Sequence, residues 1–219
     1  MDWNFIMQYS GLYKEAAFLT MKIACIGIIG SLAVGLFCGI IRYYKVPVIA
    51  KVVGIYIELS RNTPLLIQLF FLYFGLPKMG IILDSETCAA AGLIFLGGSY
   101  MAEAFRSGME AVDKIQTESG LSLGLTKKQV FFYILLPQAA AVAVPGIGAN
   151  VIFLIKETSV FSIVALADLM HVAKDLIGLY YKTDEALLML VVSYLILLLP
   201  ISIIFTYLER RLRFAGSGD

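Results

Sequence analysis

The sequence predicts an all-α membrane protein in which five transmembrane helices form a single domain over residues 1–219. Hydrophobic residues make up 60% of the chain, charged residues only 15%, and the mean hydropathy is +0.87. A soluble domain is about 45–50% apolar, so the excess apolar surface requires lipid to cover it. The net charge of +1 argues against a nucleic-acid-binding surface.

Five apolar segments are long enough to cross a bilayer, since each crossing needs about 20 mostly apolar residues. No cleavable signal precedes the first segment, because Asp2 comes before any basic residue and the apolar run after Lys14 is too long. The three cysteines fall inside the segments and predict no disulfide framework. The expected spans are residues 16–41, 52–77, 85–106, 137–156 and 185–208, and the cysteines are Cys25, Cys38 and Cys88.

Basic residues predict the orientation, because they gather on the cytoplasmic side of membrane proteins. The side with more of them carries Arg42, Lys45, Lys51, Arg106, Lys114, Lys127, Lys128, Arg210, Arg211 and Arg213. The other side carries Lys14, Lys78, Lys174 and Lys182, while Lys22, Arg61 and Lys156 are expected at span level. The N-terminus is therefore expected outside the cell and the C-terminus in the cytoplasm, together with the loop between the third and fourth spans.

The second span contains ionisable residues and a proline. Charged side chains at bilayer depth usually face a protein or aqueous interior. Glu58 and Arg61 are three residues apart, so they share a helix face and can pair. Pro64 is expected to break or kink the helix and to free backbone carbonyls that line a cavity. A structural ion pair with an ordinary proline kink is the alternative.

The third and fourth spans carry further polar groups. Glu103 and Arg106 repeat the same spacing, and Arg106 can extend to the interface while Glu103 lies a turn deeper. The run Pro145–Asn150 is expected to loosen the fourth span. After Ser159, residues 160–180 predict an external amphipathic stretch that carries Asp168, His171, Lys174 and Asp175. His171 is the only histidine of the chain and is expected to be a solvated surface residue rather than a metal ligand.

The loop between the third and fourth spans predicts a helix, a glycine turn and a second helix. Good helix formers occupy residues 109–116, and Gly124 supplies the turn. Thr126 and Gln129 fit a capping box, in which each side chain bonds the backbone of the other residue. Pro137 suits the first turn of the fourth span, where its missing N–H is no loss. An ordinary connecting loop is the alternative.

Four spaced patterns resemble those of one family. Glu118 begins E-x5-G-x9-I-x-L-P, which resembles the EAA loop of bacterial ABC importer permeases, with Ser119-Gly120 in place of two alanines. Three other runs resemble segments of the polar amino-acid permeases, the histidine/glutamine/arginine/opine group. They are E-L-x-R-x-T-P-L-L from Glu58, Y-x-x-E-x-x-R-x-G from Tyr100 and K-x-T-S from Lys156.

The resemblance implies the permease subunit of an ATP-driven importer for polar, including basic, amino acids, in the bacterial cytoplasmic membrane. It implies alternating access, a second permease copy or paralogue, two ATPase subunits and an extracytoplasmic substrate-binding protein. The chain has no G-x-x-x-x-G-K-[ST], so ATP and Mg are expected on the ATPase. We expect no enzymatic activity, cofactor or metal in this chain itself.

The resemblance also implies site residues. The substrate-binding set is Glu58, Arg61, Asn62, Thr63, Tyr100, Glu103, Asn150, Lys156, Thr158 and Ser159. The ATPase-coupling set is Glu118, Ser119, Gly120, Gly124 and Pro137. Glu103 is expected to face the substrate and to favour a basic one, because a buried carboxylate needs a cation or several donors. Permanent pairing of Glu103 with Arg106 or Arg61 is the alternative.

Two other function classes were weighed. A secondary transporter also places ionisable residues at mid-depth, usually with inverted repeats, which this sequence lacks. An intramembrane serine protease would need Ser99 and His171 as its dyad, although His171 is expected outside the lipid.

Overall fold

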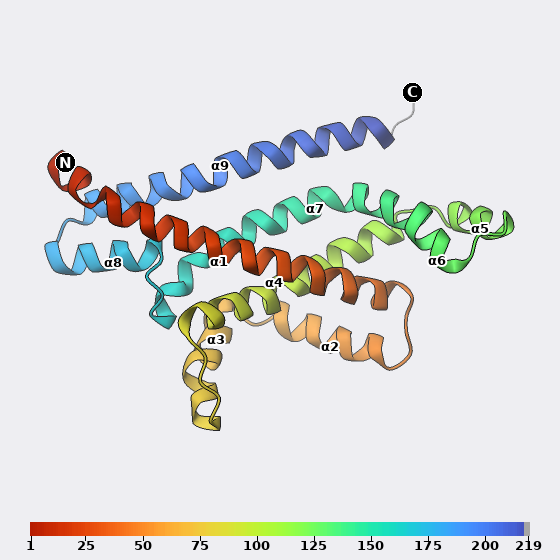
Figure 1. Ribbon diagram of the computed structural model, residues 1–219, viewed down its shortest axis with the longest axis horizontal. Helices are drawn as coiled ribbons and strands as arrows, with labels where there is room; N and C mark the ends of the chain where they lie inside the picture. Colours follow the sequence, from red (N-terminus) through yellow and green to blue (C-terminus); the bar gives the residue numbers. More distant parts are fainter. Residues whose placement is uncertain (217–219) are drawn as a thin grey trace.

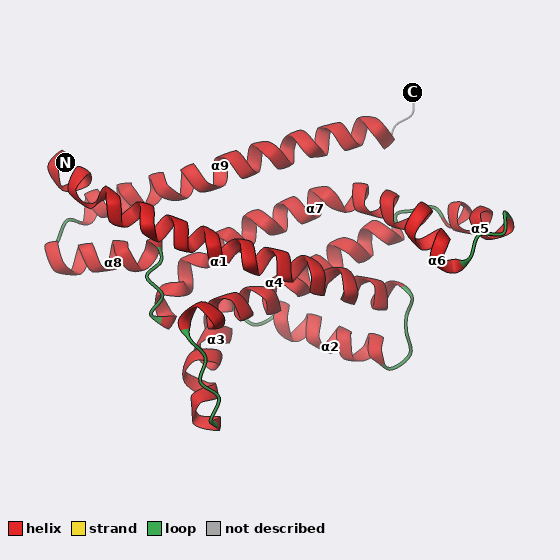
Figure 2. Cartoon of the chain, viewed as in Figure 1, coloured by secondary structure: helices red, strands yellow, loops and turns green. Residues whose placement is uncertain are grey.

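The chain forms an elongated bundle of helices. A computed structural model describes the backbone of residues 1–216 and the side chains up to Leu212, so that the side chain of Arg213 lies outside the described residues. Within this part of the chain there is no strand (Figures 1 and 2). The N-terminus and the end of the last helix, Thr183–Gly216, lie at opposite ends of the bundle (Figure 1).

Helices α1 and α4 form the centre of the bundle. They comprise Trp3–Tyr43 and Ser85–Glu110, and they make the most extensive contact between any two elements. Glycines bring the two backbones close together, since an added Cβ at Gly35 would meet the Cβ of Met101. The hydroxyl of Ser31 also donates to the carbonyl of Leu93 at 3.1 Å. Close backbone contact therefore fixes α1 against α4.

Replacing Gly35 with alanine is expected to destabilise the protein by about 1–3 kcal/mol, because the added methyl group overpacks this contact. The Cβ would collide with Met101 and lie 2.9 Å from the backbone nitrogen of Ala102. Gly11→Ala is the matched control on the same helix, since no atom lies within 4 Å of its added Cβ. Both changes gain the same helix propensity. A melting temperature that falls equally in both variants would contradict the packing argument.

Two further long helices complete the bundle. Helix α7 (Leu136–Glu157) packs on α4 and α9, and α9 (Thr183–Gly216) also contacts α1 and α8 (Leu169–Tyr180). Four stretches are long and apolar enough to cross a membrane: Trp3–Tyr43, Ser85–Glu110, Lys127–Val164 and Thr183–Leu212. They contain the first, third, fourth and fifth predicted spans. The helices extend beyond the predicted spans because apolar periodicity does not mark where a helix leaves lipid.

The second predicted span is not one helix. Helix α2 (Ile49–Arg61) ends before Asn62, and α3 (Leu65–Phe70) begins after Pro64. Helix α3 continues as a π-helical turn, η1 (Phe71–Gly75), and a 3₁₀ turn, η2 (Leu76–Met79). Helix α3 and the two turns that follow it run steeply away from α2 (Figure 1). The predicted break at Pro64 is confirmed, so the second predicted span, over 52–77, contains two helices that meet at this break.

The remaining short elements lie at the two ends. Helices α5 (Lys114–Ser122) and α6 (Lys127–Val130) lie at the end where α9 finishes (Figure 1). The 3₁₀ helix η4 (Thr158–Val164) and α8 lie towards the opposite end, near the N-terminus. Helix α6 leads into α7 through a π-helical turn, η3 (Phe131–Leu135). The long apolar stretch that contains the fourth predicted span, Lys127–Val164, thus begins ten residues before the predicted start at residue 137.

Candidate functional site

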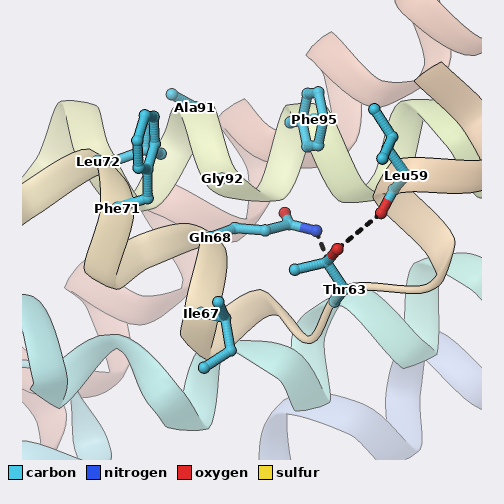
Figure 3. A pocket seen from close by; sticks show the side chains of 9 residues that line it. All are labelled: Leu59, Thr63, Ile67, Gln68, Phe71, Leu72, Ala91, Gly92 and Phe95. Atoms are coloured by element: carbon cyan, nitrogen blue, oxygen red, sulfur yellow. Dashed lines mark hydrogen bonds between the residues drawn. The ribbon is translucent and has the colours of Figure 1, made fainter. Parts of the chain in front are cut away.

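The break between α2 and α3 is held by side chains that bond to its own backbone. The amide nitrogen of Gln68 donates to the carbonyls of Ser60 and Thr63, at 3.1 and 2.9 Å. The hydroxyl of Thr63 donates to the carbonyl of Leu59 at 2.8 Å. Figure 3 shows Gln68 reaching back from α3 to Thr63. The backbone turn is therefore braced from within.

The backbone carbonyls at this break are thus less available to contact a bound molecule than the sequence predicted. The Asn62 amide also donates to the carbonyl of Glu58 at 2.8 Å. We expected freed carbonyls near Pro64 to line a cavity, but side chains already bond to those of Glu58, Leu59, Ser60 and Thr63. The polar groups that the break presents are consequently side chains.

Glu58 and Arg61 do not form the ion pair that their spacing allows and that was the alternative for this segment. Oε2 of Glu58 accepts a hydrogen bond from the Asn62 amide at 3.3 Å. The guanidinium of Arg61 instead lies over the ring of Tyr100 on α4, 5.0 Å from its centroid. A cation over an aromatic face is stabilised by the ring quadrupole. Tyr100 therefore orients Arg61 away from its neighbour on α2.

A polar cavity of about 410 Å³ opens beside the break. It is lined by Arg61, Asn62, Thr63, Pro64, Leu65, Leu96, Tyr100, Phe153 and Glu157. Its walls come from the break, from α4 and from the end of α7. Neither Arg61 nor Glu157 forms an ion pair with any other residue described. One guanidinium, one carboxylate, an amide and two hydroxyls can thus meet a bound molecule.

Glu103 lies one turn beyond Tyr100 on α4 and is not among the residues that line this cavity. Its Oε2 pairs with Arg106 at 2.7 Å, and Arg106 also pairs with Glu110 at 2.7 Å. The pairing of Glu103 and Arg106 is the arrangement that was weighed as the structural alternative. In this conformation a substrate would have to displace Arg106 to reach Glu103.

Lys156, Thr158 and Ser159 of the K-x-T-S run do not line the polar cavity. The Thr158 hydroxyl is buried, donates to the carbonyl of Ile155 at 2.7 Å and lies 3.2 Å from the phenol of Tyr194. Lys156 and Ser159 line a separate apolar groove of about 350 Å³ beside α9. Asn150 is half-buried on α7 and lines neither space. The polar cavity therefore gathers Arg61, Asn62, Thr63 and Tyr100 from the predicted set.

An apolar groove of about 560 Å³ lies on the other side of the break (Figure 3). Its lining is Leu59, Thr63, Ile67, Gln68, Phe71, Leu72, Ala91, Gly92 and Phe95. Thr63 is shared with the polar cavity, so the break separates the two spaces. The Tyr56 and Ser60 hydroxyls donate to the carbonyl of Phe95, at 2.7 and 2.9 Å, and thereby anchor α2 on α4.

The loop between α4 and α7 has the predicted helix–turn–helix form. Gly124 adopts a φ of +85° after α5, a conformation that glycine adopts at little cost. The capping box of Thr126 and Gln129 is present in both directions, and Pro137 lies in the first turn of α7. The predicted helix over 109–116 is wrong: α4 ends at Glu110, and a new helix begins at Lys114, capped by Asp113.

The coupling residues occupy two environments. Glu118 and Ser119 are exposed on α5, as a docking surface requires. Gly120 is buried, and a Cβ there would lie 2.5 Å from the Cδ1 of Ile134. The small residue at this position therefore allows α5 to pack against the helix that leads into α7.

Two polar residues of this region were missed. Glu157 was treated as the variable position of K-x-T-S, and Gln68 as part of an apolar span. Gln68 is the only strongly polar side chain between Leu65 and Phe74, and this isolation was a usable signal. Glu157 had no such signal, because its approach to the break depends on the tertiary fold.

The proposed protease dyad is not assembled. The Ser99 hydroxyl is buried and donates to the carbonyl of Leu96 at 2.6 Å. Nε2 of His171 pairs with Asp175 at 3.3 Å. Within the described residues, no group of three or more His, Cys, Asp or Glu side chains is placed to hold a metal.

Comparisons with known proteins agree with this geometry. A family model described as "Binding-protein-dependent transport system inner membrane component" matches residues 31–214. The chain is 38% identical to the "Probable glutamine ABC transporter permease protein GlnP" of Bacillus subtilis (strain 168), over 78% of this chain and 83% of that protein. It is 32% identical to the "Glutamine transport system permease protein GlnP" of Escherichia coli (strain K12), over 97% and 98%.

Two solved structures share the fold. One, titled "Crystal structure of an amino acid ABC transporter with histidines", superposes with a TM-score of 0.88 at 29% identity, over 96% of this chain and 99% of that chain. An inward-facing structure of the MetNI methionine ABC transporter superposes with a TM-score of 0.79 at 18% identity, over 94% and 98%. The second likeness concerns the fold alone.

Proposed function

The chain belongs to the family of binding-protein-dependent transport system inner membrane components, and on this premise we propose that its polar cavity binds a polar amino acid during import. The protein is a permease subunit of an ATP-driven amino-acid importer. It is a multi-pass protein of the bacterial cytoplasmic membrane and is not itself an enzyme. Membership of the family implies a complex with a partner permease and an ATPase.

The observation that carries the proposal is the placement of Arg61 and Glu157 around one cavity. An amino acid carries a carboxylate and an ammonium, and these two side chains complement both charges. Charge-assisted hydrogen bonds to a guanidinium or carboxylate are about twice as strong as neutral ones. Asn62 and Thr63 are left to contact the substrate side chain, beside the ring of Tyr100.

The charges of the lining residues indicate which class of amino-acid side chain the cavity can bind. With Glu103 paired to Arg106, the cavity has one carboxylate for the α-ammonium and none for a second cation. A neutral polar side chain such as that of glutamine suits this lining, and the two GlnP relatives are named for glutamine. A basic amino acid suits a state in which Arg106 releases Glu103, and Glu103 stays a proposed site residue on that account. Glu58, Asn150, Lys156, Thr158 and Ser159 stay proposed members of the pathway.

The importer is proposed to work by alternating access. The N-terminus is outside and α5 and α6 are in the cytoplasm, with α2 and α3 together forming the second of five crossings. Closure of two ATPase subunits would move α5, and the packed helices would transmit this as a two-state shift. An extracytoplasmic binding protein would deliver the amino acid, and ATP and Mg would stay on the ATPase.

A cysteine at Thr63 tests whether the cavity is on the substrate path. Thr63 is half-buried and lines the cavity, so Thr63→Cys is expected to react with a small water-soluble thiol reagent in liposomes. Glutamine or arginine should slow this reaction several-fold when the assembled transporter binds it. Both are measured by mass spectrometry over time, in a background without the native cysteines.

Ser60→Cys is the matched control, since Ser60 is fully buried on α2, three residues before Thr63. It should react slowly and without a response to substrate. A Thr63→Cys variant that is unreactive in every nucleotide state would identify the break as packed structure and would reject the proposed path.

A further inference from the structure

A buried carboxyl group lies where α8 begins, beside α1 and α9. Asp168 is 0% exposed and caps α8 by accepting a hydrogen bond from the backbone N–H of His171 at 2.9 Å. Its other oxygen, Oδ2, is buried and has no hydrogen-bond partner in the described part of the chain. Asp168 is thus buried, although it lies in a stretch that the sequence predicts to be external and amphipathic. A buried oxygen without a partner is costly, so the position calls for an explanation.

Asp168 and Leu169 form a corner at the start of α8, and this corner also contacts α1. The backbone N–H of Leu169 donates to the hydroxyl of Thr20 on α1 at 3.3 Å, and both residues are 0% exposed. Two consecutive residues, Asp168 and Leu169, therefore fix the start of α8, one through its own first turn and one through a neighbouring helix. Burial makes these bonds expensive to break, because water cannot replace them.

The segment next to this corner directly follows one wall of the polar cavity, which is the end of α7 at Glu157. The 3₁₀ helix η4 follows Glu157 directly and packs against α3, α4, α7 and α8. Phe161 and Val164 within it are fully buried. Helix α3 starts at Leu65, which lines the cavity from the other wall. A shift of η4 between these elements would change the separation of Glu157 from the break.

The link from η4 to Asp168 is short and constrained. Ala165 adopts a left-handed φ of 54°, which is uncommon for a residue with a side chain. The backbone N–H of Asp168 then bonds the carbonyl of Leu166 at 2.8 Å. A movement of Asp168 would therefore also move η4, because only this short and constrained link joins them.

We propose that Asp168 is a positioning residue for the polar cavity: it fixes the start of α8 against α1 and thereby sets where η4 and Glu157 lie. The inference rests on the proposed function, since it assigns Asp168 a role in the site that binds the amino acid. Asp168 does not line that cavity and acts on it through η4.

Protonation adds a dependence on pH. Desolvation raises the pKa of the Asp168 carboxyl from 3.8 to about 6, against the opposing backbone bonds of His171 and Met170. Facing groups are the uncharged Thr20 of α1, the phenol of Tyr194 on α9 and His171 on α8, whose Nε2 pairs with Asp175. Helix η4 contains no ionisable side chain.

The direction of the pH effect follows from the raised pKa. The neutral carboxyl favours the folded state, so its stabilising contribution is complete below pH 3.8 and is lost as pH rises through about 6. Above that pH the buried group carries an unpaired charge. The corner should therefore hold η4 most firmly in mildly acidic solution.

Three variants of the assembled transporter in liposomes test the inference between pH 5 and 8. Asp168→Asn keeps a good helix cap but cannot ionise, and Asp168→Ala removes the cap. Asp175→Asn is the matched control, an exposed carboxylate on the same helix that contacts the same histidine. Two quantities are measured: the melting temperature, and the concentration of glutamine or arginine that half-maximally stimulates ATP hydrolysis.

In the wild type the melting temperature should fall by several degrees as pH rises through 6, and the half-maximal concentration should rise. Asp168→Asn should show neither change, and Asp175→Asn should follow the wild type. Asp168→Ala should raise the half-maximal concentration about fivefold to tenfold, the factor that corresponds to losing one helix cap, with little change in the maximal rate.

A pH dependence that persists in Asp168→Asn, or an unchanged half-maximal concentration in Asp168→Ala, would overturn the inference. If Asp168→Ala does not assemble, the pH series of Asp168→Asn decides. Arg61→Ala, measured alongside, separates the two proposals. An unchanged half-maximal concentration in Arg61→Ala would reject the cavity as the amino-acid site. The melting temperatures measured between pH 5 and 8 need no substrate, so they show independently whether Asp168 ionises.

Discussion

Replacing Gly124 with valine is expected to abolish amino-acid-stimulated ATP hydrolysis while the permease still inserts into the membrane. Gly124 lies between α5 and α6 with a φ of +85°, and its N–H donates to the carbonyl of Leu121 at 3.0 Å. A residue other than glycine in a left-handed conformation costs about 1–3 kcal/mol. Relief of this strain would shift α5 relative to α6, and α5 carries the exposed Glu118 and Ser119. The measurement is co-purification of the ATPase, followed by stimulated hydrolysis in liposomes.

Gly80→Val provides a matched control. Gly80 also has a φ of +85°, and no atom lies within 4 Å of an added Cβ at either glycine. The two substitutions therefore impose the same backbone strain, but Gly80 follows η2 and is remote in sequence from the coupling helices. We expect Gly80→Val to lower the melting temperature similarly and to leave coupling intact. Normal ATPase binding and transport by Gly124→Val would mean that the loop is not the docking element.

Local chemistry explains why much of this architecture could be predicted. The break at Pro64, the capping box at Thr126 and the glycine turn at Gly124 each depend on residues within a few positions of one another. The apolar composition predicted five spans, and four of them lie within long helices, whereas the second is broken at Pro64. Hydropathy reports whether a residue prefers lipid, and it is blind to the direction in which a broken helix continues.

The site was harder to predict because its charges are arranged by packing. The spacing allows Glu58 to pair with Arg61, but the guanidinium lies over the ring of Tyr100 instead. Glu157 reaches the same cavity from almost a hundred residues away, on the end of α7. Asp168 lies in a stretch that the sequence predicts to be external, and it is fully buried. Each of these contacts requires the relative positions of different helices, which a single sequence does not provide.

The other large effect is expected in the polar cavity. Glu157→Gln keeps the size of the side chain and removes its charge, so the α-ammonium of the substrate loses a charge-assisted partner. Hydrogen bonds to charged groups contribute about 1.5–3 kcal/mol, and every 1.4 kcal/mol is about tenfold in affinity. The half-maximal concentration for stimulated ATP hydrolysis should therefore rise about tenfold to a hundredfold for both glutamine and arginine. Basal hydrolysis and assembly, measured in the same liposomes, should be unchanged.

Glu103→Gln shows whether a second carboxylate reads the substrate side chain. Glu110→Gln is its matched control, because Glu103 and Glu110 both pair with Arg106 at 2.7 Å. If Arg106 releases Glu103 during transport, Glu103→Gln should weaken the response to arginine more than the response to glutamine, and Glu110→Gln should not. Equal, small effects of the two changes would mean that Glu103 only holds Arg106 on α4. A Glu157→Gln transporter with a normal response to both amino acids would place the substrate elsewhere and leave Arg61 and Glu157 without a common ligand.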